Sequence, residues 1–176
     1  AELMGAISAD MPAIVINVGS MLAGKHEGAR LGACTDCRRL WAQFRAGTLD
    51  GPDLGRAHDQ LMPTSGTCMV MGTASTMACL AETLGFMLPG SATAPAVSSD
   101  RWRFAEATGK RAAEMAIAGG PRPSEILTKS ALRNASVILQ ATSGSTNAIV
   151  HLAAIAGRAG IPYDLEELDA VGRDVP

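Results

Sequence analysis

The stretch that decides the fold is Pro63-Thr64-Ser65-Gly66-Thr67-Cys68-Met69-Val70-Met71-Gly72-Thr73-Ala74-Ser75-Thr76-Met77. Pro63 and Gly66 interrupt whatever precedes them, and Ser65 and Thr67 are residue types that cap helix N-termini. From Val70 onward the apolar residues recur at steps of four and three, which predicts one face of a helix. That face consists of Val70, Ala74, Met77, Ala81 and Leu84.

Cys68 is placed by this pattern where a helix begins. The helix dipole favours a thiolate there, and a thiolate binds metal ions or attacks electrophiles. A buried core cysteine is the alternative that the geometry leaves open. A second face of the same helix carries only small side chains, which predicts the close approach of another backbone or a cofactor; these are Gly72, Ser75, Thr76 and Cys79.

The composition limits the function classes. Apolar residues make up 47% of the 176 residues but aromatic residues only 3%, and the net charge of −2 gives no electrostatic footprint for nucleic acid. The apolar run from Met11 to Val18 is too short to span a bilayer, and no basic segment precedes it as in a signal peptide. We therefore expect a cytoplasmic protein without a membrane or nucleic-acid partner.

The run Ala13-Ile14-Val15-Ile16-Asn17-Val18 is typical of a strand buried on both faces. With helices expected on either side of it, the sequence predicts an α/β layered domain with a mostly parallel sheet flanked by helices, incomplete at both ends. The helices are expected near residues 1–10, 36–44, 51–62, 70–84, 102–116, 128–139, 149–156 and 165–168. Residues 88–99 are expected to form an ordered surface loop.

Cys34-Thr35-Asp36-Cys37 forms a CxxC motif, which occurs in zinc sites and in redox pairs. No second CxxC or pair of histidines follows it. Asp36 resembles a helix N-cap, and Cys37 then shares an apolar stripe with Leu40, so Cys37 is interpreted as a core residue. The role of Cys34 stays open, and His26 is interpreted as a solvated loop residue.

Thr142-Ser143-Gly144-Ser145-Thr146-Asn147 is a second polar loop that opens a helix. Free N–H groups and hydroxyl side chains at a helix start can bind phosphate or carboxylate, which makes Ser145, Thr146 and Asn147 candidate substrate residues. Ordinary helix capping is the alternative. No lysine follows the glycine, so this loop is not a nucleotide-hydrolysing P-loop.

Residues 66–77, Gly-Thr-Cys-Met-Val-Met-Gly-Thr-Ala-Ser-Thr-Met, closely resemble the family of dihydroxy-acid, phosphogluconate and aldonate (sugar-acid) dehydratases. The similarity continues through residues 126–128, 134–135, 144–148 and 151–152, and so covers nearly the whole chain. The resemblance implies that residues 1–176 are an interior part of the N-terminal iron–sulfur domain, with a C-terminal domain outside them.

The resemblance also implies the cofactors. Cys68 matches one of three family cysteines that hold an iron–sulfur cluster, expected to be [2Fe–2S] rather than [4Fe–4S]. The other two cysteines, the magnesium ligands and the catalytic base fall outside this segment, which is therefore expected to hold no catalytic residue and to be inactive alone. Cys34, Cys37 and Cys79 match no family ligand.

The activity implied is that of a hydro-lyase, which converts a 2,3-dihydroxy carboxylate into a 2-keto-3-deoxy acid. Met-Gly-Thr-Ala-Ser-Thr-Met at 71–77 looks more like the sugar-acid members, and the dihydroxy-acid dehydratase of branched-chain amino-acid biosynthesis is the alternative. The expected partners are a small polyhydroxy acid and, at full length, further copies of the protein. A small CxxC redox, zinc or anion-binding module is the competing hypothesis from another class.

Overall fold

The structure, a computed structural model, describes residues 1–175. This part of the chain is mostly helical, and its strands form one short antiparallel hairpin. The elements are α1 (Glu2–Ala9), β1 (Lys25–His26), β2 (Ala29–Arg30), α2 (Ala33–Arg45), α3 (Gly51–Asp59), α4 (Thr73–Thr83), α5 (Ser99–Ala118), α6 (Pro123–Ile126), α7 (Lys129–Ala141), α8 (Asn147–Arg158) and α9 (Leu165–Asp174).

The predicted α/β domain with a mostly parallel sheet is wrong. The run from Ala13 to Val18 is extended, but no strand pairs with it among residues 1–175. Its backbone is tied to the helical body by the Val15 amide, which donates to the Phe86 carbonyl at 2.7 Å. Val18 is 67% exposed, so the run is not buried on both faces. Parallel pairing is reduced to an isolated bridge between Ser20 and Thr67.

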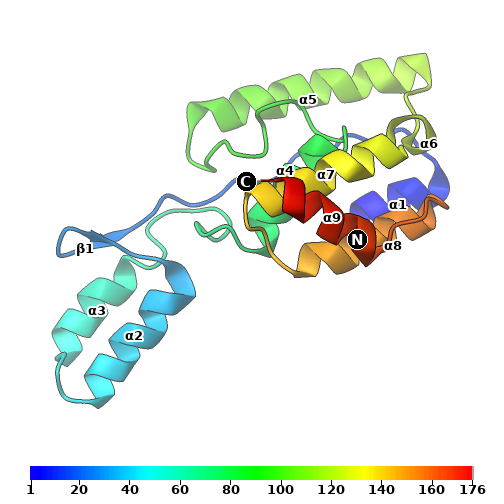
Figure 1. Cartoon of the computed structure of the whole chain (residues 1–176). Coiled ribbons are helices and arrows are strands. Elements are labelled where there is room, and N and C mark those ends of the chain that lie inside the picture. Colours follow the sequence, from blue (N-terminus) through cyan, green and yellow to red (C-terminus); the bar gives the residue numbers. More distant parts are fainter. Residues whose placement is uncertain (176) are drawn as a thin grey trace.

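The helical body contains α1, α4, α7, α8 and α9, with α7 packed against both α4 and α9 and with α1 packed against α8 (Figure 1). Helical periodicity explains this packing, because the apolar stripes that the sequence predicts on α7 and α8 are the faces buried in the body. Burying these apolar side chains is the main force that holds the body together. Its core consists of Ile7, Leu80, Leu84, Phe86, Leu127, Leu132, Ala135, Leu139, Ala148, Leu152, Ile155, Ala156 and Leu168.

Residues 24–62 form an arm that extends away from this body (Figure 1). The arm contains the hairpin β1–β2 and the helices α2 and α3, which pack against each other. It has a small core of its own, made of Leu31, Leu40, Leu54, Ala57 and Leu61. The predicted helices in this region are therefore confirmed, although α2 begins at Ala33 and includes Asp36 in its first turn.

Helix α5 is long and mostly exposed, and it lies along one side of the body (Figure 1). Its buried residues are Arg101, Thr108 and Met115. The loop that precedes it is ordered, as predicted, because the Glu82 carboxylate accepts the Gly90 and Ala92 amides at 2.7 Å each. Within residues 1–175, neither α5 nor any other helix has the length and apolar character needed to cross a membrane.

Candidate functional site

Cys68 lies in the loop between α3 and α4, and the prediction that it opens a helix is wrong. Helix α4 begins at Thr73, with Gly72 as its N-cap in an extended conformation. Val70, the expected first residue of the apolar helical face, lies outside the helix and is 40% exposed. The Gly72 amide donates to the Val70 carbonyl at 2.7 Å, a tight turn that keeps residues 70–72 from continuing the helix backward.

The backbone directly before Cys68 is paired with a distant segment. The Thr67 amide donates to the Gly19 carbonyl at 2.9 Å, and the Thr67 carbonyl accepts the Met21 amide at 2.8 Å. These two bonds form the parallel bridge between Ser20 and Thr67. Since both backbone polar groups of Thr67 are engaged, the position of Cys68 is set by segment 19–21 and not by the helix that follows.

Gly66 permits this pairing. It has a φ of +133°, which residues with side chains rarely adopt, and a Cβ added here would lie 2.6 Å from the carbonyl carbon of Ser20. Only a residue without a side chain lets the two backbones come this close. The glycine that the sequence pattern marks as a helix breaker therefore acts as the contact point beneath the Cys68 loop.

The loop 142–147 comes close to Thr76 on the small-residue face of α4, so the predicted close approach of another backbone is confirmed at that position. A Cβ added at Gly144 would lie 2.8 Å from the Thr76 methyl carbon. The Ser145 amide donates to the Thr76 hydroxyl at 3.1 Å. The two polar loops that the sequence singles out therefore meet at the first turns of α4.

Ser145 and Asn147 use their polar groups at this junction. The hydroxyls of Ser145 and Thr73 share a hydrogen bond of 2.9 Å, and the Asn147 side-chain amide donates to the Thr73 hydroxyl at 3.0 Å. Thr146 is the N-cap residue of α8 but makes no capping bond with its side chain. The Ser145 hydroxyl instead accepts the Asn147 amide at 3.3 Å, so the predicted capping role holds for Ser145. A role for Ser145, Thr146 and Asn147 in binding substrate stays a prediction.

A hollow of about 410 Å³ lies beside the Cys68 loop. It is lined from one side by Met69, Val70 and Met71 and from the arm by residues 30–32. The hollow therefore lies between the arm and the loop that contains Cys68, and Leu31 on its arm side belongs to the arm core. The residues after Cys68 thus present apolar side chains, which lower the local dielectric around any group bound there.

Cys68 fits the role of one ligand of a cluster, and the described chain supplies no others nearby. Its thiol is free and half-buried. Among residues 1–175, no set of three close metal-ligating side chains includes Cys68. A cluster needs several thiolate or equivalent ligands, so the remaining ones would have to come from outside this part of the chain.

The other cysteines lie in different surroundings. Cys79 is on α4 at the edge of a small cluster with Ala78, Ala81 and Met87. Burial raises the pKa of the Cys79 thiol, and the nearby Glu82 carboxylate raises it further, which disfavours the thiolate that binds metal.

Cys34 and Cys37 lie in the first turns of α2, where Cys34 is exposed and Cys37 packs against the arm core as predicted. They line a hollow of about 310 Å³ together with Arg38, His58 and the apolar side chain of Leu61. No set of three close ligating side chains within residues 1–175 includes either cysteine. His58 lines the same hollow, but it does not lie close enough to both cysteines to form a set of three ligands with them.

His26 is placed within 3.5 Å of the Asp53 carboxylate, and Glu27 lies close to both. The sequence pattern missed this cluster, because Asp53 looks like an ordinary first-turn residue of α3. Arg56 pairs with the same oxygen of Asp53 at 2.8 Å, so the cluster already holds a cation. His26 therefore lies against the Asp53–Arg56 ion pair of the arm, and it is not a freely solvated loop residue.

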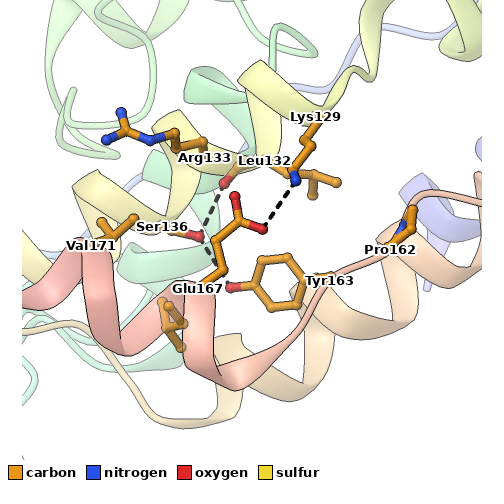
Figure 2. A pocket seen from close by; sticks show the side chains of 9 residues that line it. Lys129, Leu132, Arg133, Ser136, Pro162, Tyr163, Glu167 and Val171 are labelled. Carbon is orange, nitrogen blue, oxygen red and sulfur yellow. Dashed lines mark hydrogen bonds and ion pairs between the residues drawn. The ribbon is translucent and has the colours of Figure 1, made fainter.

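The seam between α7 and α9 contains a cavity of only about 10 Å³, shown in Figure 2. There Lys129 pairs with Glu167 at 3.5 Å, and the Ser136 and Tyr163 hydroxyls lie 3.1 Å apart. Burial raises the pKa of Tyr163. A space of this size holds at most one water molecule, so the seam is packing and not a substrate site.

Comparison with known proteins identifies the family to which the chain belongs. The sequence profile described as "Dihydroxy-acid/6-phosphogluconate dehydratase N-terminal" matches residues 1–176. The chain belongs to this dehydratase family. Cys68, the Thr67 bridge and the junction of α4 with loop 142–147 are thus features of a dehydratase-family N-terminal region.

Relatives within the dehydratase family carry two kinds of name. The chain is 48% identical over 176 residues to an L-arabonate dehydratase of Azospirillum brasilense and 45% identical over 174 residues to an L-arabinonate dehydratase of Rhizobium leguminosarum bv. trifolii. It is 40% identical over 174 residues to a dihydroxy-acid dehydratase of Methanospirillum hungatei. These alignments cover 99–100% of the chain but only 30–31% of the relatives, so the chain spans about a third of their length.

Proposed function

We propose that residues 1–176 are part of a hydro-lyase that removes water from a 2,3-dihydroxy carboxylate, with Cys68 as the iron–sulfur ligand that this segment contributes. The observation that carries the proposal is the position of Cys68: a free, half-buried thiol directly after Thr67, whose backbone amide and carbonyl are both bonded to segment 19–21. A rigid ligand of this kind suits a cluster, because ligand geometry sets the properties of the metal.

The cluster, when bound, would supply a Lewis-acidic iron for the departing hydroxyl group. The residues of this chain would hold and shield it. Thr67 and Gly66 fix the Cys68 backbone, and Met69 to Met71 supply apolar cover. A [2Fe–2S] cluster and a magnesium ion in the full-length protein remain part of the proposal, as does the inactivity of residues 1–176 alone.

We favour a sugar acid as the substrate. Two relatives named for L-arabonate are 48% and 45% identical to the chain, against 40% for the dihydroxy-acid dehydratase of Methanospirillum hungatei. The sugar-acid variant of the motif at 71–77 points in the same direction. A branched 2,3-dihydroxy acid of amino-acid biosynthesis is the alternative, and the two substrates differ in their hydroxyl groups beyond C3.

The ligand assignment is tested in the native protein that contains this chain. Iron and acid-labile sulfide are measured in the wild type, in Cys68→Ser and in the matched control Cys79→Ser. We expect Cys68→Ser to lose most of its iron, sulfide and visible absorption, and Cys79→Ser to keep them. Full retention of the cluster in Cys68→Ser would contradict the assignment.

The substrate is tested with the same preparation. L-arabonate and a branched 2,3-dihydroxy acid are supplied separately, and the 2-keto acid formed is trapped as a hydrazone. We expect faster turnover of the aldonate. A preference for the branched acid would assign the protein to the other branch of the family, and turnover of neither would reject the hydro-lyase proposal for these two substrate classes.

A further inference from the structure

Arg101, near the start of α5, is a buried cation held by neutral oxygens. Arg101 is only 7% exposed, and within residues 1–175 no carboxylate forms an ion pair with it. One terminal nitrogen donates to the Asn17 backbone oxygen at 3.1 Å and to the Asn17 side-chain oxygen at 2.7 Å. The other donates to the carbonyls of Ser91, at 2.9 Å, and Ala94.

Burying an arginine without a counter-ion costs free energy of folding, because the charge loses its hydration. Four acceptors from two segments, 17 and 91–94, offset part of that cost. The arrangement uses the planar fork of the guanidinium, because each terminal nitrogen serves one segment. A lysine has a single nitrogen and cannot span both segments in this way.

The segment that Arg101 holds is the one that pairs with the Cys68 loop. Gly19 lies two residues after Asn17, and it has a φ of +90° and an added Cβ that would lie 2.9 Å from the Arg101 Nε atom. Along one edge of segment 17–21, the Ala96 amide donates to the Ser20 carbonyl at 2.9 Å. Along the other edge of the same segment, the Gly19 carbonyl accepts the Thr67 amide.

We infer that Arg101 is a positioning residue for Cys68, acting through segment 17–21, whose two edges are bonded to residue 96 and to Thr67. The inference rests on the proposed function, in which Cys68 is a cluster ligand. Arg101 touches neither the cysteine nor any reacting atom. It fixes the segment that in turn fixes the backbone of Thr67, and so the direction from which the Cys68 sulfur approaches its metal.

The experiment uses the native holoprotein and the variants Arg101→Met, Arg101→Lys and Asn17→Ala. Arg103→Met is the matched control, because Arg103 lies on the same helix and its side chain is 74% exposed. Two quantities are measured: the rate of cluster release to an iron chelator, followed by the visible absorption, and backbone hydrogen exchange of peptides that cover residues 17–21 and 66–68.

We expect Arg101→Met to release the cluster about tenfold faster than the wild type, the size of effect typical of residues that orient a metal ligand. Exchange should rise in 17–21 and 66–68, while α7 and α8 keep their protection. Arg101→Lys should resemble Arg101→Met, Asn17→Ala should show a smaller effect in the same peptides, and Arg103→Met should match the wild type.

A wild-type release rate in Arg101→Met overturns the inference. Loss of protection throughout α7 and α8 in both Arg101→Met and Asn17→Ala also overturns it, because the residue would then merely stabilise the whole fold. Failure of the proposed function gives a different result: a cluster retained in Cys68→Ser rejects the ligand assignment, whereas a cluster lost in Cys68→Ser but held normally in Arg101→Met rejects this inference alone.

Discussion

The hydroxyl groups of Thr73 and Ser145 lie 2.9 Å apart although 72 positions separate the two residues in the chain. Thr73 also accepts the side-chain amide of Asn147 at 3.0 Å. One threonine at the start of α4 thus holds the polar loop before α8, and it does so within the same motif that contains Cys68. The ligand loop and the second polar loop are therefore coupled through Thr73, in addition to the bond between the Ser145 amide and the Thr76 hydroxyl.

Replacing Thr73 by valine keeps the shape of the side chain but removes both hydrogen bonds. We expect Thr73→Val to lower the free energy of unfolding by about 1–3 kcal/mol, because Ser145 loses a partner in a half-buried site and Asn147 loses one at the surface. Thr146→Val is the control, since Thr146 is exposed and its side chain makes no capping bond. Urea unfolding followed by circular dichroism measures both, and equal stabilities would contradict the coupling.

Gly66 should tolerate substitution far less than another glycine with positive φ. Gly47 has a φ of +72° with open space around its α-carbon, so Gly47→Ala carries only conformational strain of about 1 kcal/mol. Gly66→Ala adds a collision with the backbone of Ser20 and Met21 and should cost at least about 3 kcal/mol. Thermal unfolding of the two variants tests the difference, and similar costs would argue against the close backbone contact.

Asp10 links the end of α1 to the start of α6, and this link should depend on pH. Its carboxylate accepts the Ser124 amide and hydroxyl at 2.9 Å each, and these bonds lower the pKa of Asp10. A lowered pKa in the folded state means that the stabilisation is present above the ordinary aspartate pKa and is lost as the pH falls through the folded value.

We therefore expect Asp10→Asn to unfold at a lower temperature than the wild type at pH 7 and at the same temperature once both are strongly acidic. Asp59→Asn is a comparison for the loss of one exposed carboxylate. Thermal unfolding scans between pH 7 and pH 2 measure the difference, and a constant gap between wild type and Asp10→Asn over that range would contradict the mechanism.

The cysteines should differ in thiol reactivity. Cys34 is exposed, whereas burial and the Glu82 carboxylate raise the pKa of the half-buried Cys79. The thiolate is the reactive form, so at pH 8 iodoacetamide should modify Cys34 at least about tenfold faster than Cys79. Mass spectrometry of peptides sampled over time gives both rates, and comparable rates would mean that the cluster around Cys79 does not shield its thiol.

The helical part of the fold could be predicted where burial follows the helical period. Leu132, Ala135 and Leu139 on α7 form a buried stripe, as their spacing predicts. On α5 the pattern fails to show which side is buried: Trp102, whose spacing marks the helix, is 77% exposed, while Arg101 beside it is buried. Periodicity locates a helix, but it finds the packed face only when that face is apolar.

The prediction of a parallel sheet was wrong because a short apolar run does not reveal which segment, if any, it pairs with. The run from Ala13 to Val18 has the β-branched composition of a strand, yet its contacts are with α4 and the loop that follows, through Val15. Strand formation depends on a partner elsewhere in the chain, which local sequence does not reveal. The same limit hides the bridge between Ser20 and Thr67.

Within the candidate site, Cys68 could be found from its motif, but its surroundings could not. The pairing of Thr67 with Gly19 joins residues 48 positions apart, a spacing without any sequence signature. Arg101 gave no signal either, because an arginine in the first turn of an amphipathic helix looks like a surface residue. Its role depends on the carbonyl oxygens that the fold brings around it.

The bridge between Ser20 and Thr67 also closes the two ends of the arm. The Leu22 amide donates to the Thr64 hydroxyl at 2.9 Å, so the outgoing and returning segments are fastened together where they leave the body. Everything between them, residues 24–62, packs on a core of its own. The arm therefore packs as a unit of its own. We expect changes of length between α2 and α3 to leave in place both the bridge and the hollow that residues 30–32 share with Met69, Val70 and Met71.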